Sequence, residues 1–196
     1  MENIKTGFKK LYLAQILTII GALSFLVTKE YWYLGIVFIV LDIAAFFINL
    51  KGLKTLSTDF EGYNKAYKFA IAGIVVDLVA LVLAFVFNNN PEVGKVVDST
   101  TKALSNAIEY GICWLVLKTS VELCNSKGLV DIADYAKKTS ALLTFCYAVG
   151  ILIDLFNTSQ TWALLVVLAV AVITLVVFVI GQIRYIIFLK KMRDNF

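Results

Sequence analysis

Three acidic residues lie inside long apolar runs of this 196-residue chain, where ionisable side chains are rare. Asp42, Asp77 and Glu109 each stand nine residues from a lysine at the edge of the run. Nine residues of helix span about 13.5 Å, so the carboxylates would lie near the midplane of a bilayer core about 30 Å thick. Acids at that level can hold a cation, a proton or an amine-bearing small molecule, or they can join neighbouring helices by hydrogen bonds.

Two further polar residues stand at a comparable depth in the last apolar run. Gln182 precedes Lys191 by nine residues, and Arg184 follows two residues later. One guanidinium cannot neutralise three carboxylates, so protons, water or a bound cation must balance the rest. The predicted ligand or ion centre consists of Asp42, Asp77, Glu109, Gln182 and Arg184. The structural alternative is that these residues only hold the helices together.

The sequence lacks the residues of common catalytic and metal sites. It has no histidine, which removes imidazole ligands and the usual general base. Its three cysteines, Cys113, Cys124 and Cys146, form no CxxC pair, and no GxSxG, HExxH or phosphate-loop motif is present. We therefore expect no enzyme, no catalytic residues, no metal site and no cofactor.

The composition indicates a membrane protein whose main partner is the lipid bilayer. Hydrophobic residues make up 60% of the chain and charged residues 16%, and the mean hydropathy is +0.85. A soluble domain of this size cannot bury so much apolar surface. The net charge of +4 comes from basic residues at the ends of apolar runs, which argues against nucleic-acid binding. Sixteen lysines against two arginines favour a bacterial cytoplasmic membrane.

Apolar run lengths predict an all-α polytopic protein with six transmembrane helices. The expected spans are 11–27, 32–50, 67–87, 103–117, 141–156 and 162–180, the last continuing as far as 189. With both termini on one side, fifteen of the eighteen basic residues share that side, which the positive-inside rule identifies as cytoplasmic. The Asn90–Pro91 pair predicts a turn in the outer loop between the third and fourth spans.

The six spans read as three tandem helix hairpins within a single transmembrane domain, residues 1–196. The returning helices end in "LDIAAFFINLK", "IEYGICWLVLK" and "GQIRYIIFLKK", which suggests repeats at 8–60, 61–127 and 128–196. Any helix that ends at the cytoplasmic face tends to finish with a lysine, so chance similarity is the competing explanation. One glycine per span is expected to allow close helix contact: Gly21, Gly35, Gly73, Gly111, Gly150 and Gly181.

Two functional hypotheses follow from this pattern. The first is a transport or ligand-binding protein whose acidic centre takes a cation, a proton or an amine-bearing small molecule. The second is a non-catalytic membrane subunit, immunity protein or anchor that acts through a protein partner. For the second hypothesis, the cytoplasmic loops 51–66 and 118–138 are the expected docking segments, because they are long and of mixed charge.

Overall fold

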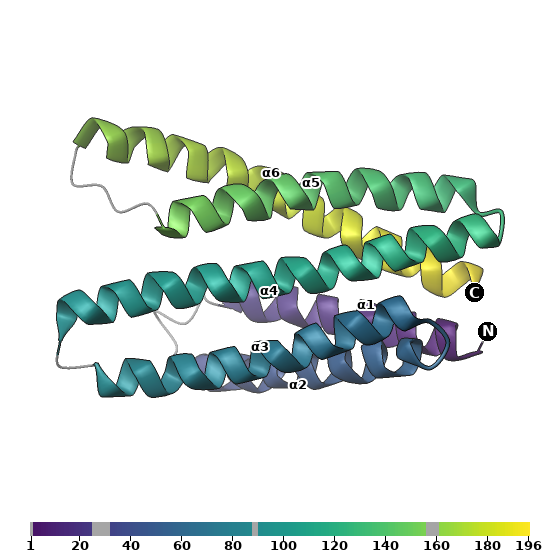
Figure 1. Cartoon of the computed structure of the whole chain (residues 1–196), viewed down its shortest axis with the longest axis horizontal. Helices are drawn as coiled ribbons and strands as arrows, with labels where there is room; N and C mark the ends of the chain where they lie inside the picture. The colour runs from purple at the N-terminus through teal and green to yellow at the C-terminus, as the bar shows by residue number, and fades with distance from the viewer. Residues whose placement is uncertain (1, 25–31, 88–89, 156–160) are drawn as a thin grey trace. The chain divides into compact units, whose positions relative to one another are not determined.

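The computed structural model describes residues 2–24, 32–87, 90–155 and 161–196, and the elements in these ranges are all helical (Figure 1). The prediction of an all-α protein is confirmed. The six helices are α1 (Glu2–Ser24), α2 (Trp32–Ser57), α3 (Glu61–Val86), α4 (Pro91–Ser126), α5 (Val130–Leu155) and α6 (Thr161–Asn195).

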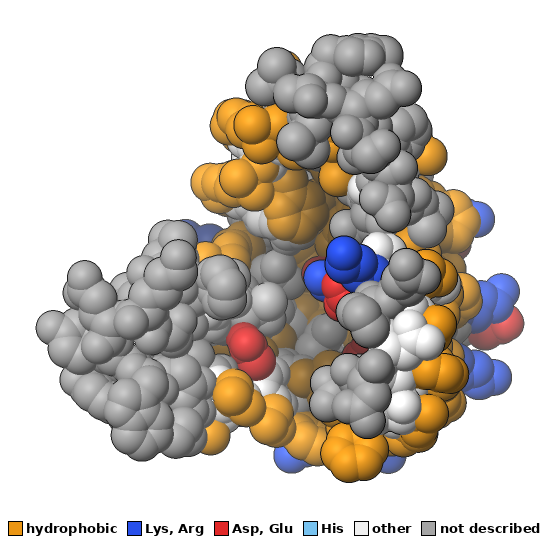
Figure 2. Space-filling model, turned by 90° about the vertical axis from the view of Figure 1, so that its left-hand side faces the viewer, with side chains coloured by type: hydrophobic (Ala, Val, Ile, Leu, Met, Phe, Trp, Pro, Cys, Tyr) orange, Lys and Arg blue, Asp and Glu red, His pale blue; other side chains and the backbone are white. Residues whose placement is uncertain are grey.

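Three of these helices are long and apolar enough to cross a membrane. Within the described residues the candidate spans are Glu61–Leu83, Val130–Ile153 and Val167–Asn195. Large apolar side chains stand exposed on these spans, such as Leu81 with 68% of its surface accessible. Figure 2 shows hydrophobic side chains over most of the coloured surface of one face. Apolar surface of this extent calls for lipid rather than water, which is the behaviour of a membrane protein.

The helices form two compact units. Unit 1 consists of Met1–Tyr67 with Tyr185–Phe196, and unit 2 of Lys68–Arg184. Helices α3 and α6 therefore contribute to both units. This division follows packing and does not test sequence duplication, so the three repeats 8–60, 61–127 and 128–196 stay a prediction.

In unit 1, glycines bring α1 and α2 together in antiparallel fashion. A Cβ atom at Gly7 would lie 2.5 Å from Cγ of Leu56 and 3.2 Å from the carbonyl oxygen of Gly52. At the other end of the pair, the Asp42 carboxyl lies directly against Gly21. Only residues without a side chain allow such an approach, so Gly7, Gly52 and Gly21 are all needed for the close packing of this helix pair.

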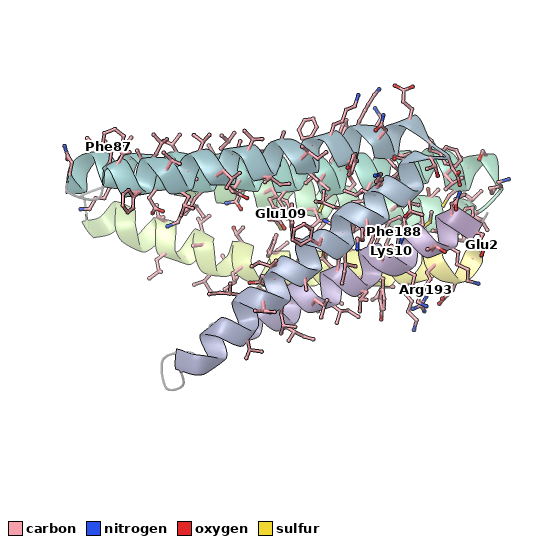
Figure 3. The ribbon with its side chains drawn as sticks, turned by 90° about the horizontal axis from the view of Figure 1, so that it is seen from below. Glu2, Lys10, Phe87, Glu109, Phe188 and Arg193 are labelled. Atoms are coloured by element: carbon pink, nitrogen blue, oxygen red, sulfur yellow. The ribbon has the colours of Figure 1, made fainter. Side chains whose placement is uncertain are left out.

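An aromatic cluster forms the core at the Gly7 end of unit 1. The Phe8 ring is fully buried and packs edge-on against Tyr63, with centroids 5.9 Å apart, and against Phe188, at 6.4 Å. Tyr185 stacks on Phe188 at 6.3 Å. Figure 3 labels Phe188 on α6. These contacts attach the last turns of α6 to α1 and the start of α3, since edge-on and offset rings attract one another.

In unit 2, three of the predicted glycines lie at helix contacts. A Cβ atom at Gly111 would lie 3.0 Å from the Phe69 ring, and one at Gly181 would lie 2.8 Å from Cδ2 of Leu143. Gly73 similarly faces Ile108. The prediction of close contact holds at these positions and at Gly21. It does not hold for Gly150, around which the described residues leave open space. Gly35 lies outside the side chains that the structure describes.

The helices extend beyond the predicted fourth span and into the two segments predicted as cytoplasmic loops, 51–66 and 118–138, while the spans themselves stay a prediction. Helix α4 begins at Pro91 rather than residue 103, because the Asn90 side chain accepts a hydrogen bond from the Val93 N–H at 3.3 Å and proline suits the first helical turn. Segment 118–138 consists of two helix ends joined at Lys127–Leu129, where Gly128 adopts φ +72°. Segment 51–66 likewise contains only a turn at 58–60. Lysines predict where a chain leaves the membrane, but a helix can continue past that point.

Burial of the α4 end predicts an unreactive thiol at Cys124, which lies beyond the expected fourth span. Burial raises the pKa of Cys124 to about 11. The thiolate is the reacting form, so at pH 8 its population is about a hundredfold below that of an ordinary thiol with a pKa near 9. We expect Cys124 to react with iodoacetamide at least a hundredfold more slowly than a cysteine introduced by Ser126→Cys, measured by mass spectrometry. Equal rates would contradict a buried Cys124.

Candidate functional site

The site centres on Tyr147 of α5, in the interior of unit 2. Only 4% of this residue is accessible, and its buried hydroxyl makes no hydrogen bond within the described residues. The Glu109 carboxyl of α4 and the Gln182 amide of α6 are the side chains that interact with this hydroxyl. The structure therefore brings two of the predicted centre residues, Glu109 and Gln182, next to Tyr147, which the prediction did not include.

Aromatic rings enclose the Tyr147 side chain. The Tyr147 ring lies 5.5 Å from that of Phe178 in an edge-on arrangement and 5.7 Å from that of Tyr110. The Tyr110 hydroxyl is in turn hydrogen-bonded to the Thr144 hydroxyl at 3.0 Å. Gly181 permits the close contact of α6 with Leu143 of α5 and so sets the position of the adjacent Gln182.

A cavity of about 220 Å³ opens beside Tyr147 between α4, α5 and α6. Its wall is mainly apolar, with a few polar groups from Tyr147, Asn106 and Thr174. The Phe178 ring forms part of the same wall, and Gly150 leaves room where a side chain would fill it. A mainly apolar cavity with a few convergent polar groups has the character of a small-molecule site.

Asp77 of α3 contacts α4 close to the position of Glu109. The Ser105 hydroxyl donates a hydrogen bond to Asp77 Oδ1 at 3.0 Å, and Ser105 lies one helical turn before Glu109. Both acids keep exposed side chains. Figure 3 labels Glu109 part-way along α4, well away from the end of unit 2 that carries Phe87. A carboxylate at such a depth needs water or a positive charge near it, because exposure to hydrocarbon is costly.

The other two predicted centre residues have different surroundings. The Arg184 guanidinium stacks over the Tyr135 ring at 4.5 Å, and none of the described acids forms an ion pair with it. Asp42 belongs to unit 1, where its carboxyl faces Gly21. The part that either residue plays in a ligand centre stays a prediction.

Tyr147 could have been found from the sequence by a different criterion. It stands in "LLTFCYAVGIL", where Thr144 and Tyr147 carry the hydroxyl groups of an otherwise apolar stretch. A search for hydroxyl groups at the depth of Glu109, in addition to charges, would have included it.

The chain matches no protein-family model, no curated protein and no solved structure.

Proposed function

We propose that the chain is a six-span membrane protein, with both termini cytoplasmic, that binds an amine-bearing organic cation at the Glu109–Tyr147–Gln182 cluster of unit 2. Binding serves either transport or ligand sensing, without a catalytic step. The three helices able to cross a membrane and the one-sided distribution of basic residues support this arrangement.

The observation that carries the proposal is the Tyr147 hydroxyl, buried without a hydrogen bond beside a cavity. Leaving such a group unsatisfied costs roughly 1–3 kcal/mol in a folded protein. A cost of this size is tolerated where a ligand supplies the missing partner. We propose that a molecule bound in the adjacent cavity, whose wall includes Tyr147, supplies this partner.

The chemistry around the cavity favours an organic ammonium over a bare metal ion. Glu109 and Gln182 do not line the cavity themselves, but both interact with Tyr147, which does, and the Glu109 carboxylate supplies negative charge next to it. The rings of Tyr147 and Phe178 offer the faces and carbon contacts that alkylammonium groups prefer. A hard metal ion would instead need about six oxygen ligands, whereas this cavity is lined mainly by carbon.

Thermal melting of the full chain in detergent tests the proposal. Primary and quaternary alkylammonium ions should raise the melting temperature saturably, because a ligand at a hundred times its Kd stabilises the folded state by about 2.7 kcal/mol. Neutral alcohols of the same shape, sodium and potassium serve as controls. An unchanged melting temperature with every amine, or an equal rise with the neutral alcohols, would contradict amine binding and favour the alternative of a membrane subunit that acts through a protein partner.

A further inference from the structure

A second hollow in unit 2 has a different chemical character from the Tyr147 cavity. It has a volume of about 380 Å³ and lies between α4 and α5. Helix α4 contributes Trp114, Lys118 and Glu122, and α5 contributes Lys137 and Ser140. Thr144 of α5 also lines this hollow, here called the α4–α5 groove, which therefore combines two ammonium groups with one carboxylate, an indole ring and two hydroxyls.

The ammonium groups of the groove are within reach of a ligand. The Lys118 ammonium lies over the Trp114 ring, 5.0 Å from its centroid. Lys137 is 3.5 Å from the Asp134 carboxylate, and both of these side chains are 58% exposed. An exposed pair of this kind is worth little, so an anion can draw the lysine away at small cost. Among the residues that line the groove, two lysines stand beside the single acid Glu122. The Asp134 carboxylate balances Lys137 only through the exposed pair that an anionic ligand would replace.

The groove also presents an apolar surface beside its charges. Leu117 and Ala141 line it together with the Trp114 ring. In the proposed topology the fourth span ends at residue 117 and the fifth begins at residue 141. The groove thus lies at the cytoplasmic membrane interface, the level at which tryptophan and lysine side chains concentrate. The lysines of the groove therefore lie next to its apolar wall, in the same order as the phosphate and the acyl chains of a phospholipid.

We propose that the α4–α5 groove binds an anionic phospholipid of the cytoplasmic leaflet. Lys118 and Lys137 bind the phosphate, Ser140 donates a hydrogen bond to it, and the Trp114, Leu117 and Ala141 side chains contact the upper acyl chain. Basic pockets between membrane helices on the cytoplasmic side are suited to such headgroups. The apolar wall argues for a lipid rather than free phosphate. This site shares neither Glu109 nor Tyr147 with the amine site, so either can exist without the other.

Lipid titration of the full chain in a neutral detergent tests the assignment. Phosphatidylglycerol and phosphatidylcholine with identical acyl chains are compared, with inorganic phosphate as a third probe. The groove variant is Lys118→Gln with Lys137→Gln. The matched control, Lys127→Gln with Lys138→Gln, removes the same charge from the same end of α4 and α5 outside the groove. Melting temperature and the binding of lipid seen by native mass spectrometry are measured for each protein.

Phosphatidylglycerol should stabilise the wild-type chain and the control, and bind the groove variant about thirtyfold more weakly, because each interfacial lysine contributes about fivefold to anionic lipid binding. Phosphatidylcholine should have little effect. If the control variant loses as much affinity for phosphatidylglycerol as the groove variant, the binding depends on general surface charge and the groove is not the site. Equal stabilisation by phosphatidylcholine, or by inorganic phosphate at matched concentration, would overturn the anionic lipid as its occupant.

Discussion

Replacing Glu109 by glutamine should abolish the rise in melting temperature that organic amines produce. Glutamine keeps the shape of the side chain and its hydrogen-bonding capacity but removes the negative charge. A hydrogen bond to a charged group contributes about 1.5–3 kcal/mol, so amine affinity should fall at least tenfold. Titration of the purified variant with the alkylammonium ion that stabilises the wild type most strongly measures this directly.

Two companion variants separate a ligand site from a structural role. Glu61→Gln makes the same chemical change at an exposed residue 3.7 Å from Lys65 and should leave the amine response intact. Tyr147→Phe removes the buried hydroxyl that has no hydrogen bond, so the ligand-free protein should keep or gain stability while amine affinity falls. A Glu109→Gln protein that is less stable yet binds amines as tightly as the wild type would identify Glu109 as a structural residue only.

The sequence was sufficient for the fold class but not for the ends of the helices. Apolar runs and lysines locate where a chain enters a membrane, because both respond to the transfer from water to lipid. They do not say where the backbone stops being helical. That depends on local features such as the Asn90 cap before Pro91 and the positive φ of Gly128. Long loops were expected at 51–66 and 118–138 because the point where the chain leaves the membrane was taken to be the point where its helix ends.

The same distinction explains which site residues could be foreseen. Glu109 and Gln182 are visible because polar side chains are rare in apolar runs, and unit 2 places both beside Tyr147. Tyr147 itself escaped notice because tyrosine is common near membranes and reads as an interface residue. Contacts such as Arg184 over the Tyr135 ring depend on the rotation of one helix against another. The depth of a residue in the membrane can be counted along the sequence. The rotation of a helix about its axis depends on how it packs against other helices, which the sequence of that helix does not give.

Replacing Gly7 by valine should destabilise the protein by about 3 kcal/mol, near the upper end of the cost of overpacking. The new Cβ atom would lie 2.5 Å from Cγ of Leu56, which is fully buried and cannot swing aside. The Gly52 carbonyl oxygen, 3.2 Å away, blocks relief by a shift in the other direction. Equilibrium unfolding in mixed detergent micelles measures the change, with Gly7→Ala expected to show a smaller loss.

The alanine exchange at Gly150 supplies a control with the opposite sign. A Cβ atom there meets nothing within 4 Å, so Gly150→Ala should stabilise the ligand-free protein by about 0.5–1 kcal/mol through helix propensity alone. Leu56→Ala tests the mechanism, because Gly7→Ala should cost less in that background than in the wild type, by a coupling energy of at least about 0.5 kcal/mol. Additive losses would mean that Gly7 matters for a reason other than its contact with Leu56, such as backbone freedom in α1.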